Sequence, residues 1–293
     1  MQFTLSNASL SAIVRTHGGE LVSLRDSGGT EYIWGGDPAF WSGQNPILFP
    51  IVGSLKDGRV DIGGQSCEMS RHGFARNLDF TPVEQGGDFI SLELRESGET
   101  LKRYPFPFSL RVRHQLLKDG FSTAFTVENT GGSLLPFCIG AHTAFRCPLF
   151  PGERFEDYRL VFDQPEDAST LLLTSEGLIR GGAAAPMLSG GVLPLDYETF
   201  RRLDTVIFRQ LRSRAVSLAH RETRRGVKME FSQFPMIAFW TKPGAPFLCL
   251  EPWQGCAASD DESGCFTDKP FAVTLAPGER KTLAYSVTLL SGK

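Results

Sequence analysis

The chain has 293 residues, a hydrophobic fraction of 41% and a formal net charge of −3. This composition excludes a largely disordered chain, since the apolar residues, among them 23 phenylalanines, suffice for a sizeable core. The small negative charge argues against nucleic acid or an anionic membrane as partner, and no run of 18 apolar residues occurs that would predict a membrane span.

Short segments of alternating polar and apolar residues open the chain. Four of them lie within the first 36 residues, QFTLSN, SAIVRTHG, ELVSLRD and EYIWGG, and glycine pairs punctuate them. Alternation with a period of two is typical of a half-buried strand. The next such segment, residues 57–69, contains Asp-Gly and Gly-Gly pairs and predicts a β-hairpin.

Strands are also predicted in the middle of the chain, over residues 89–97, 108–117 and 121–131. More alternating segments follow as far as TLAYSVTLL near the C-terminus, and few segments have a helical period. Regularly spaced strands without intervening helices favour stacked antiparallel sheets over an α/β fold. We therefore predict an all-β fold, a large antiparallel β-sandwich with few short helices, as a single domain over residues 1–293.

One segment breaks this pattern. Residues 175–191, SEGLIRGGAAAPMLSGG, are rich in glycine and alanine. Such a composition predicts a long connection, which is either a mobile loop over a cleft or a plain surface connection.

The N-terminus and the cysteines bear on the cellular location. The segment MQFTLSNASLSAIV has neither the basic residues nor the long apolar stretch of a signal peptide. None of the six cysteines forms a C-x-x-C pair, so the spacing indicates neither a zinc ribbon nor a thioredoxin-type site. We predict a cytoplasmic protein whose cysteines are small buried residues or bystanders.

Histidines are the first candidates for chemistry, because imidazole titrates near neutral pH. His17, His114 and His220 occur in strand-like or turn segments and are interpreted as structural, with His114 and His220 on the surface of a sheet. His72 lies in SRHGFARN, where charged and polar residues surround a glycine, and His142 ends the apolar run LLPFCIGA. Both of these imidazoles are expected outside the core, in a hydrogen-bonding or a catalytic role.

Glu251 is the third candidate, at the end of the apolar strand FLCLE. Pro252 restricts the backbone of Glu251 to extended conformations, and Trp253 offers an apolar wall. A carboxylate with reduced hydration has a raised pKa and is a better general base near neutral pH. Together with an imidazole it makes an acid–base pair.

Other kinds of site are weaker interpretations of these residues. His72, His142 and Glu251 could hold zinc or iron, but they lack the local spacing of motifs such as H-E-x-x-H. No G-x-S-x-G is present for a serine nucleophile, and GSLKDG lacks the end of a phosphate-binding loop. We predict a site without metal or cofactor.

Four motifs together resemble those of the aldose 1-epimerases, the galactose mutarotase-like proteins, and in particular their shorter bacterial members. The motifs are NPILFPIVGSLKDG, SRHGFARNLDF, IGAHTAFRCP and FLCLEPWQG, in this order. The resemblance covers nearly the whole chain. It implies a large antiparallel sandwich with an open sugar cleft, and interconversion of the α and β anomers of free hexoses without metal or cofactor.

The resemblance also implies roles for single residues. Glu251 matches the general base that removes the proton of the anomeric hydroxyl, His142 the general acid at the ring oxygen, and His72 a histidine that binds sugar oxygens. Asp204 in RRLDTVIF loosely matches a sugar-binding aspartate and is otherwise an ordinary residue at the start of a strand. Trp253 is expected either to wall off Glu251 or to stack on the sugar.

One position departs from the family's pattern. Members usually carry an arginine after the glycine of FPIVG, where it contacts the sugar, whereas this chain has Ser54. Arg71 or Arg76, close to His72 in the sequence, could supply the missing cation, or the substrate differs.

The predicted function is that of an aldose 1-epimerase, an isomerase that acts on a small aldohexose as a monomer or homodimer, with no nucleic acid or membrane partner. A first alternative is epimerisation of a hexose 6-phosphate, which needs two or three cations at the end of the cleft away from Glu251. A second is a sugar-binding or regulatory protein without turnover, although such a protein needs no acid–base pair. Glycoside hydrolysis is a weaker alternative, because it normally needs a second well-placed carboxylate.

Overall fold

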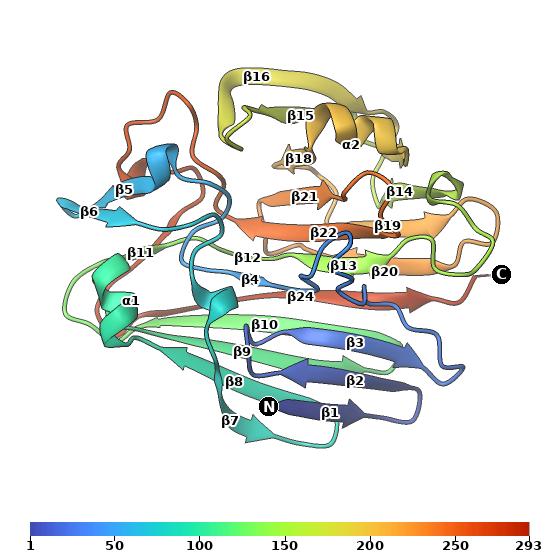
Figure 1. The fold of residues 1–293 in the computed structure, drawn as a ribbon, viewed down its shortest axis with the longest axis horizontal. Coiled ribbons are helices and arrows are strands. Elements are labelled where there is room, and N and C mark those ends of the chain that lie inside the picture. Colours follow the sequence, from blue (N-terminus) through green and yellow to red (C-terminus); the bar gives the residue numbers. More distant parts are fainter. Residues whose placement is uncertain (293) are drawn as a thin grey trace.

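Two large antiparallel sheets form the body of the protein in the computed structural model, which describes residues 1–292 (Figure 1). The larger sheet has nine strands in the order β17-β14-β19-β20-β24-β10-β9-β8-β7. Their bounds are β7 (Thr81–Gln85), β8 (Phe89–Arg95), β9 (Phe108–Leu117), β10 (Gly120–Asn129), β14 (Tyr158–Phe162), β17 (Val192–Pro194), β19 (Ala215–His220), β20 (Gly226–Glu230) and β24 (Arg280–Leu290). The three strands predicted in the middle of the chain are confirmed as β8, β9 and β10.

The second sheet has six strands and carries Glu251 and Trp253, two of the candidate site residues. Its order is β18-β21-β22-β12-β4, and β13 also pairs with β22. The bounds are β4 (Ile47–Leu48), β12 (Ile139–Ala141), β13 (Thr143–Arg146), β18 (Thr205–Arg209), β21 (Met236–Trp240) and β22 (Phe247–Gln254). Because β12 and β13 pair with successive parts of β22, the residue between them faces the middle of that strand.

Side chains from the two sheets meet in one apolar core. The ring of Phe162 on β14 lies 5.9 Å from Phe208 on β18 and 6.0 Å from Phe239 on β21. At the other end, the ring of Phe49 lies 5.0 Å from that of Phe108 on β9. These contacts confirm the predicted sandwich, in which one face of each sheet is buried against the other.

Smaller elements surround the two sheets. Strands β1 (Gln2–Ser6), β2 (Leu10–Arg15) and β3 (Leu21–Asp26) form a third sheet, and three two-stranded pairs are β5 (Arg59–Ile62) with β6 (Gln65–Glu68), β11 (Leu135–Phe137) with β23 (Val273–Leu275), and β15 (Ala168–Leu173) with β16 (Ile179–Leu188). The two short α-helices are α1 (Gly98–Arg103) and α2 (Tyr197–Leu203). Within residues 1–292, neither helix has the length and apolar character needed to cross a bilayer.

The interpretation of residues 175–191 as a loop is wrong for most of its length. Residues 179–188 form β16, which pairs antiparallel with β15. Small side chains do not prevent pairing, because the backbone groups make the ladder. Only the turn between β15 and β16, residues 174–178, and the residues after Leu188 connect strands.

The expected surface position of His114 is also wrong. Its side chain on β9 is 1% exposed, with Nδ1 2.9 Å from Thr123 Oγ1 and Nε2 2.8 Å from the carbonyl oxygen of Gly19. Gly19 lies just before β3, so the imidazole joins the nine-stranded sheet to the three-stranded sheet that covers it.

Candidate active site

A cavity of about 230 Å³ opens on the outer face of the six-stranded sheet, and every predicted site residue lines it. Thr205 and Ile207 of β18 line the cavity, and Ile207 also packs with Val206 and Phe208 in the apolar core. The residues predicted from the sequence that line it are Arg71, His72, Arg76, His142, Asp204, Glu251 and Trp253. Positions far apart in the sequence thus converge on one site.

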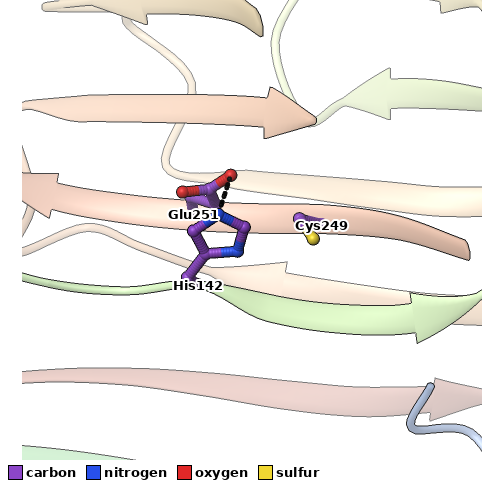
Figure 2. Close-up of side chains that lie close together, drawn as sticks. All are labelled: His142, Cys249 and Glu251. Carbon is purple, nitrogen blue, oxygen red and sulfur yellow. Dashed lines mark ion pairs between the residues drawn. The ribbon is translucent and has the colours of Figure 1, made fainter. Parts of the chain in front are cut away.

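His142 and Glu251 are in direct contact at the floor of the cavity. The His142 Nε2 atom lies 3.3 Å from Glu251 Oε1 (Figure 2). The strand register explains this contact: Gly140 pairs with Trp253 and Thr143 with Leu250, so His142 lies opposite Glu251. Gly140 is required here, because a Cβ atom at this position would lie 2.8 Å from the Trp253 ring.

Burial raises the pKa of Glu251 well above its ordinary value. The side chain is 1% exposed, and the charge of Asp204 raises the pKa further. The indole N–H of Trp253 opposes this shift, although its geometry falls short of a formed hydrogen bond and Nε1 has no partner among the described residues. Trp253 is itself 4% exposed and lines the cavity next to Glu251.

Aromatic rings surround His142. The ring of Trp41 lies 4.9 Å away, that of Trp240 5.7 Å and that of His72 5.6 Å. Burial in this environment, assisted by the charge of Arg76, lowers the pKa of His142 to about 3. The pKa of the imidazole is thus lowered and that of the facing carboxyl group is raised, so burial favours the uncharged form of both groups.

His72 occupies a strained turn at the cavity wall. Its φ is +68°, and the following Gly73 also has a positive φ of +73°. The His72 Nδ1 atom accepts a hydrogen bond of 3.1 Å from the backbone N–H of Gly53. Nδ1 is therefore unprotonated, and Nε2 carries the hydrogen of the neutral ring. Burial lowers the pKa of His72 well below its ordinary value, which agrees with a neutral hydrogen-bond donor.

Ser54 carries no charge itself, but its hydroxyl helps to position the guanidinium group of Arg71. Arg71 Nε donates a hydrogen bond of 2.9 Å to Ser54 Oγ, and the same guanidinium donates at 3.3 Å to the carbonyl oxygen of Glu176 in the turn between β15 and β16. Position 177 requires glycine, because a Cβ atom there would lie 2.2 Å from the guanidinium group of Arg71. The arginine expected at position 54 is absent, and Arg71 brings a guanidinium to the cavity from the neighbouring loop.

Arg76 supplies a second guanidinium to the cavity. Burial lowers its pKa, and Glu20 is the acid whose charge counters this shift. Glu20 is, however, paired with Arg15 at 3.1 Å, and within residues 1–292 no carboxylate forms an ion pair with Arg76. This partly buried cation is thus available to a ligand.

Asp204 lies at the end of α2. It is the C-terminal cap residue of that helix, with a φ of +59°, and its Oδ2 atom accepts a hydrogen bond of 2.9 Å from Thr205 Oγ1. The residue thus precedes a strand, as predicted, and its carboxylate borders the cavity.

Two tryptophans in the site were missed by the sequence analysis. Trp240 ends β21, and Trp41 lies in the loop DPAFWSG. The loop is held in place because the Trp41 carbonyl accepts from Trp34 Nε1 at 2.9 Å and the Phe40 carbonyl accepts from Lys242 Nζ at 3.2 Å. The one signal in the sequence was Trp41, a large aromatic residue in a segment with the composition of a turn.

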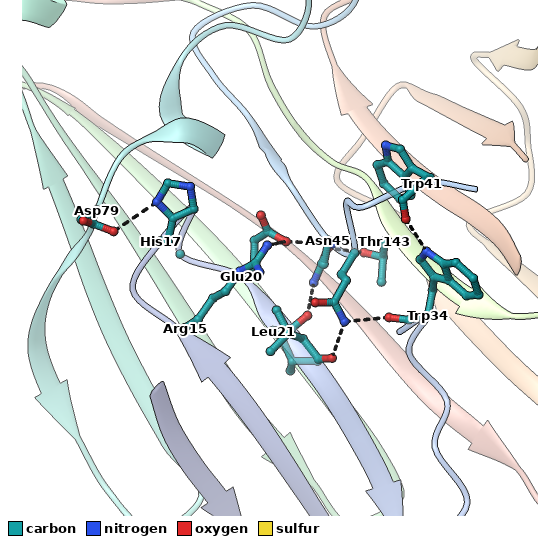
Figure 3. A network of polar contacts seen from close by, with 12 residues as sticks. Arg15, His17, Glu20, Leu21, Trp34, Trp41, Asn45, Asp79 and Thr143 are labelled. Carbon is teal, nitrogen blue, oxygen red and sulfur yellow. Dashed lines mark hydrogen bonds and ion pairs between the residues drawn. The ribbon is translucent and has the colours of Figure 1, made fainter. Parts of the chain in front are cut away.

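A buried polar network supports the site from behind (Figure 3). Thr143, next to His142, donates to Asn45 Oδ1 at 2.8 Å and lies 3.1 Å from the hydroxyl of Tyr285 on β24. The Asn45 backbone N–H in turn donates to Glu20 at 3.0 Å. The network fixes the junction of β12 and β13 to both neighbouring sheets, and thereby fixes the imidazole of His142.

Comparison with known proteins gives consistent results over the whole length. The family model described as "Aldose 1-epimerase" matches residues 1–288. The chromosomal and plasmid LacX proteins of Lactococcus lactis subsp. lactis are each 36% identical over 300 residues, covering 99% of this chain and 100% of theirs.

Solved structures show the same arrangement. A galactose mutarotase related enzyme from Lactobacillus acidophilus superposes with a TM-score of 0.95 at 28% identity, covering 100% of this chain and 98% of its own. A galactose mutarotase-like protein from Lactobacillus casei superposes with a TM-score of 0.91, also at 28% identity, covering 99% of this chain and 100% of its own.

Proposed function

Because the chain belongs to the aldose 1-epimerase family, we propose that it interconverts the α and β anomers of an aldose in this cavity. The observation that carries the proposal is the contact of 3.3 Å between His142 and Glu251 beside a cavity of about 230 Å³ that polar and aromatic side chains line. Anomer exchange requires one proton to leave the sugar and one to reach it, and this pair provides both functions without further groups.

The pair enters the reaction with one proton. When this proton lies on His142, Glu251 is a carboxylate with a raised pKa and can take the proton from the hydroxyl on C1. His142 gives its proton to the ring oxygen, the bond between C1 and that oxygen breaks, and the electron pair of the departing O–H bond forms the aldehyde. Rotation about the C1–C2 bond and the reverse proton transfers close the ring as the other anomer. Positioned acid–base catalysis of this kind contributes about 10²–10⁴-fold in rate.

The remaining polar residues would bind the sugar hydroxyls. His72 offers the hydrogen on Nε2, Arg71 a guanidinium held by Ser54, and Asp204 an acceptor. Trp41 and Trp240 would give the sugar an apolar face to lie against.

A hexose 6-phosphate is the second candidate substrate. The observation in its favour is the pair of guanidinium groups, Arg71 and Arg76, of which Arg76 is partly buried and has no carboxylate partner in the described chain. A phosphate would neutralise them and accept several of their hydrogen bonds.

The test is the rate of anomer exchange in freshly dissolved α-glucose, α-galactose and glucose 6-phosphate, followed by polarimetry or NMR. We expect acceleration with one of these sugars, unaffected by EDTA and lost in Glu251→Gln. Tight sugar binding without any acceleration would contradict the enzymatic function and indicate a sugar-binding protein.

A further inference from the structure

A thiol lies beside the acid–base pair and takes no part in the proposed reaction. Cys249 precedes Glu251 by two residues on β22, so both side chains leave the same face of the sheet. One ligand atom each from Cys249, Glu251 and His142 lies within 4.8 Å of the other two, and the three side chains are drawn in Figure 2. The third member of this cluster is thus Cys249 rather than His72, the residue considered with the pair in the sequence.

The ligand atoms of the cluster are buried and partly uncommitted. Cys249 is 0% exposed and His142 7%. His142 Nδ1 and Glu251 Oε2 have no hydrogen-bond partner in the described part of the chain. A buried polar atom without a partner costs about 1–3 kcal/mol, so a ligand that satisfies these atoms is favoured. His142 and Glu251 also line the cavity, which gives an ion a path from solvent.

The chemistry of the three donors selects a class of metal ion. A thiolate, an imidazole and a carboxylate are ligands of zinc, whereas magnesium and calcium prefer oxygen alone. When the thiol and the carboxyl group lose their protons, their two negative charges balance the two positive charges of the ion. Such a neutral arrangement suits a site of low dielectric and offsets the repulsion from Arg71 and Arg76.

The distances require only a small movement. Zinc binds such ligands at about 2.0–2.3 Å, which places ligand atoms about 3.5 Å apart in a tetrahedron. The widest separation in the cluster therefore has to close by about 1 Å, within the reach of side-chain rotation. The fourth position of the ion faces the cavity and is open to water or to a sugar oxygen.

We propose that Cys249, His142 and Glu251 bind a zinc ion at the floor of the cavity, and that the bound ion inhibits anomer exchange. The ion ties up the imidazole and the carboxyl group of the pair, so the pair can act neither as base nor as acid. The proposed zinc binding depends only on the three clustered residues, whereas the proposed inhibition of anomer exchange also rests on the proposed function.

Cadmium is the probe for binding, because a cadmium–thiolate bond absorbs in the ultraviolet. All proteins carry Cys265→Ser, which removes the one cysteine that is not buried among the six. We expect one equivalent of cadmium to give the absorption band, and zinc to abolish it by competition. Cys249→Ala should lose the band and bind zinc about tenfold to a hundredfold more weakly or worse. Cys147→Ala, a buried cysteine outside the cluster, is the matched control and should keep both.

Cys249→Ser provides a second variant in case the alanine variant does not fold, since its hydroxyl fills the space but binds zinc poorly. Retention of the band and of zinc affinity in a folded Cys249 variant would overturn the proposed site.

The inhibition is measured as the rate of anomer exchange against zinc concentration, with each variant compared with its own metal-free rate. We expect wild-type exchange to stop with zinc and to recover with EDTA, and Cys249→Ala to need at least about tenfold more zinc. Exchange that continues while zinc fills the site would overturn the inhibition. Absence of exchange in the metal-free protein would contradict the proposed function and remove the inhibition with it, while the absorption would still decide the binding.

Discussion

Two buried histidines differ in their hydrogen bonding although their burial is similar. They are His114 in the nine-stranded sheet and His142 in the six-stranded sheet. Burial is the main cause that lowers the pKa of both, to about 4 for His114 and about 3 for His142. Both nitrogens of His114 have protein partners, Thr123 Oγ1 and the Gly19 carbonyl. His142 has one partner, Glu251, and its Nδ1 has none among residues 1–292.

The difference lies in unmet hydrogen bonding and not in burial. A fully satisfied imidazole holds two sheets together and has no capacity left for a ligand. An imidazole with a free nitrogen costs stability, and the protein retains it next to a cavity where a ligand or a proton can use it. Hydrogen-bond partners therefore distinguish a structural buried histidine from one that is available to a ligand, whereas a lowered pKa is common to both.

The largest expected effect is that of His142→Ala on turnover. We expect kcat to fall about 10²–10⁴-fold with a smaller change in KM, because the lost group acts in proton transfer. The free energy of unfolding should also fall, by about 1–3 kcal/mol, because the buried Glu251 loses its partner. Anomer exchange by NMR and urea unfolding measure the two quantities. An unchanged kcat would remove His142 from the acid role.

For His114→Ala the expected loss is in stability alone. The variant leaves the Gly19 carbonyl and the Thr123 hydroxyl without a partner and opens a cavity in the core, so the free energy of unfolding should fall by about 2–4 kcal/mol. Its kcat should be unaffected under conditions in which the variant is folded. A loss of kcat without a loss of stability would break the distinction between the two histidines.

The pH dependence of stability sharpens the same comparison. Below pH 6.5 the unfolded chain binds a proton at His114, whereas the folded chain stays neutral there down to about pH 4. The free energy of unfolding therefore falls as the pH falls through this window, by about 1.4 kcal/mol per pH unit for this one group.

His114→Gln should reduce the slope by that amount, measured by urea unfolding between pH 6 and 4.5. An identical slope in the variant would contradict the assignment. The same substitution at position 142 should not give a one-proton change, because Glu251, 3.3 Å away, shares the proton.

His72 is the intermediate case and should show the smallest effect. One of its nitrogens is satisfied by Gly53 and the other borders the cavity. His72→Asn keeps a residue that tolerates the positive φ, and its shorter amide does not reach the position of the imidazole Nε2–H. We expect KM to rise up to about tenfold, the value of one hydrogen bond, with kcat changed less. A fall in kcat as large as that of His142→Ala would mean that His72 acts in proton transfer itself.

The sheets could be predicted from the sequence because their strands alternate strictly. The helices could not, because α1 and α2 have only 6 and 7 residues and begin at caps, Ser97 and Asp196, that also occur in turns. The strand β16 was hidden by its glycines and alanines, since backbone pairing with β15 requires no side-chain signature. His114 was misplaced because alternation shows that a strand has two faces and does not tell which further sheet covers one of them.

The residues that line the cavity could be picked out one by one, because each lies in a motif with a polar group beside apolar residues. Glu251 was expected at the end of a strand but lies inside β22, which continues to Gln254. The mutual geometry of these residues could not be predicted, because it depends on pairing between β22 and the broken pair β12 and β13, which lie more than 100 residues earlier in the chain. Trp41 and Cys249 were missed for the same reason. Each is a candidate site residue only because it lies close to His142 in space, and neither is close to it in the sequence.

The hydrogen bond from Arg71 to the Glu176 carbonyl also ties together two parts of the chain that are far apart in sequence. It joins the loop that carries His72 to the turn between β15 and β16, and Arg71 and Gly177, the neighbour of Glu176, line the cavity. Because the acceptor is a backbone atom, this link does not depend on the side chain at position 176. The wall of the cavity is thus closed across two loops by a contact that substitution of Glu176 leaves in place.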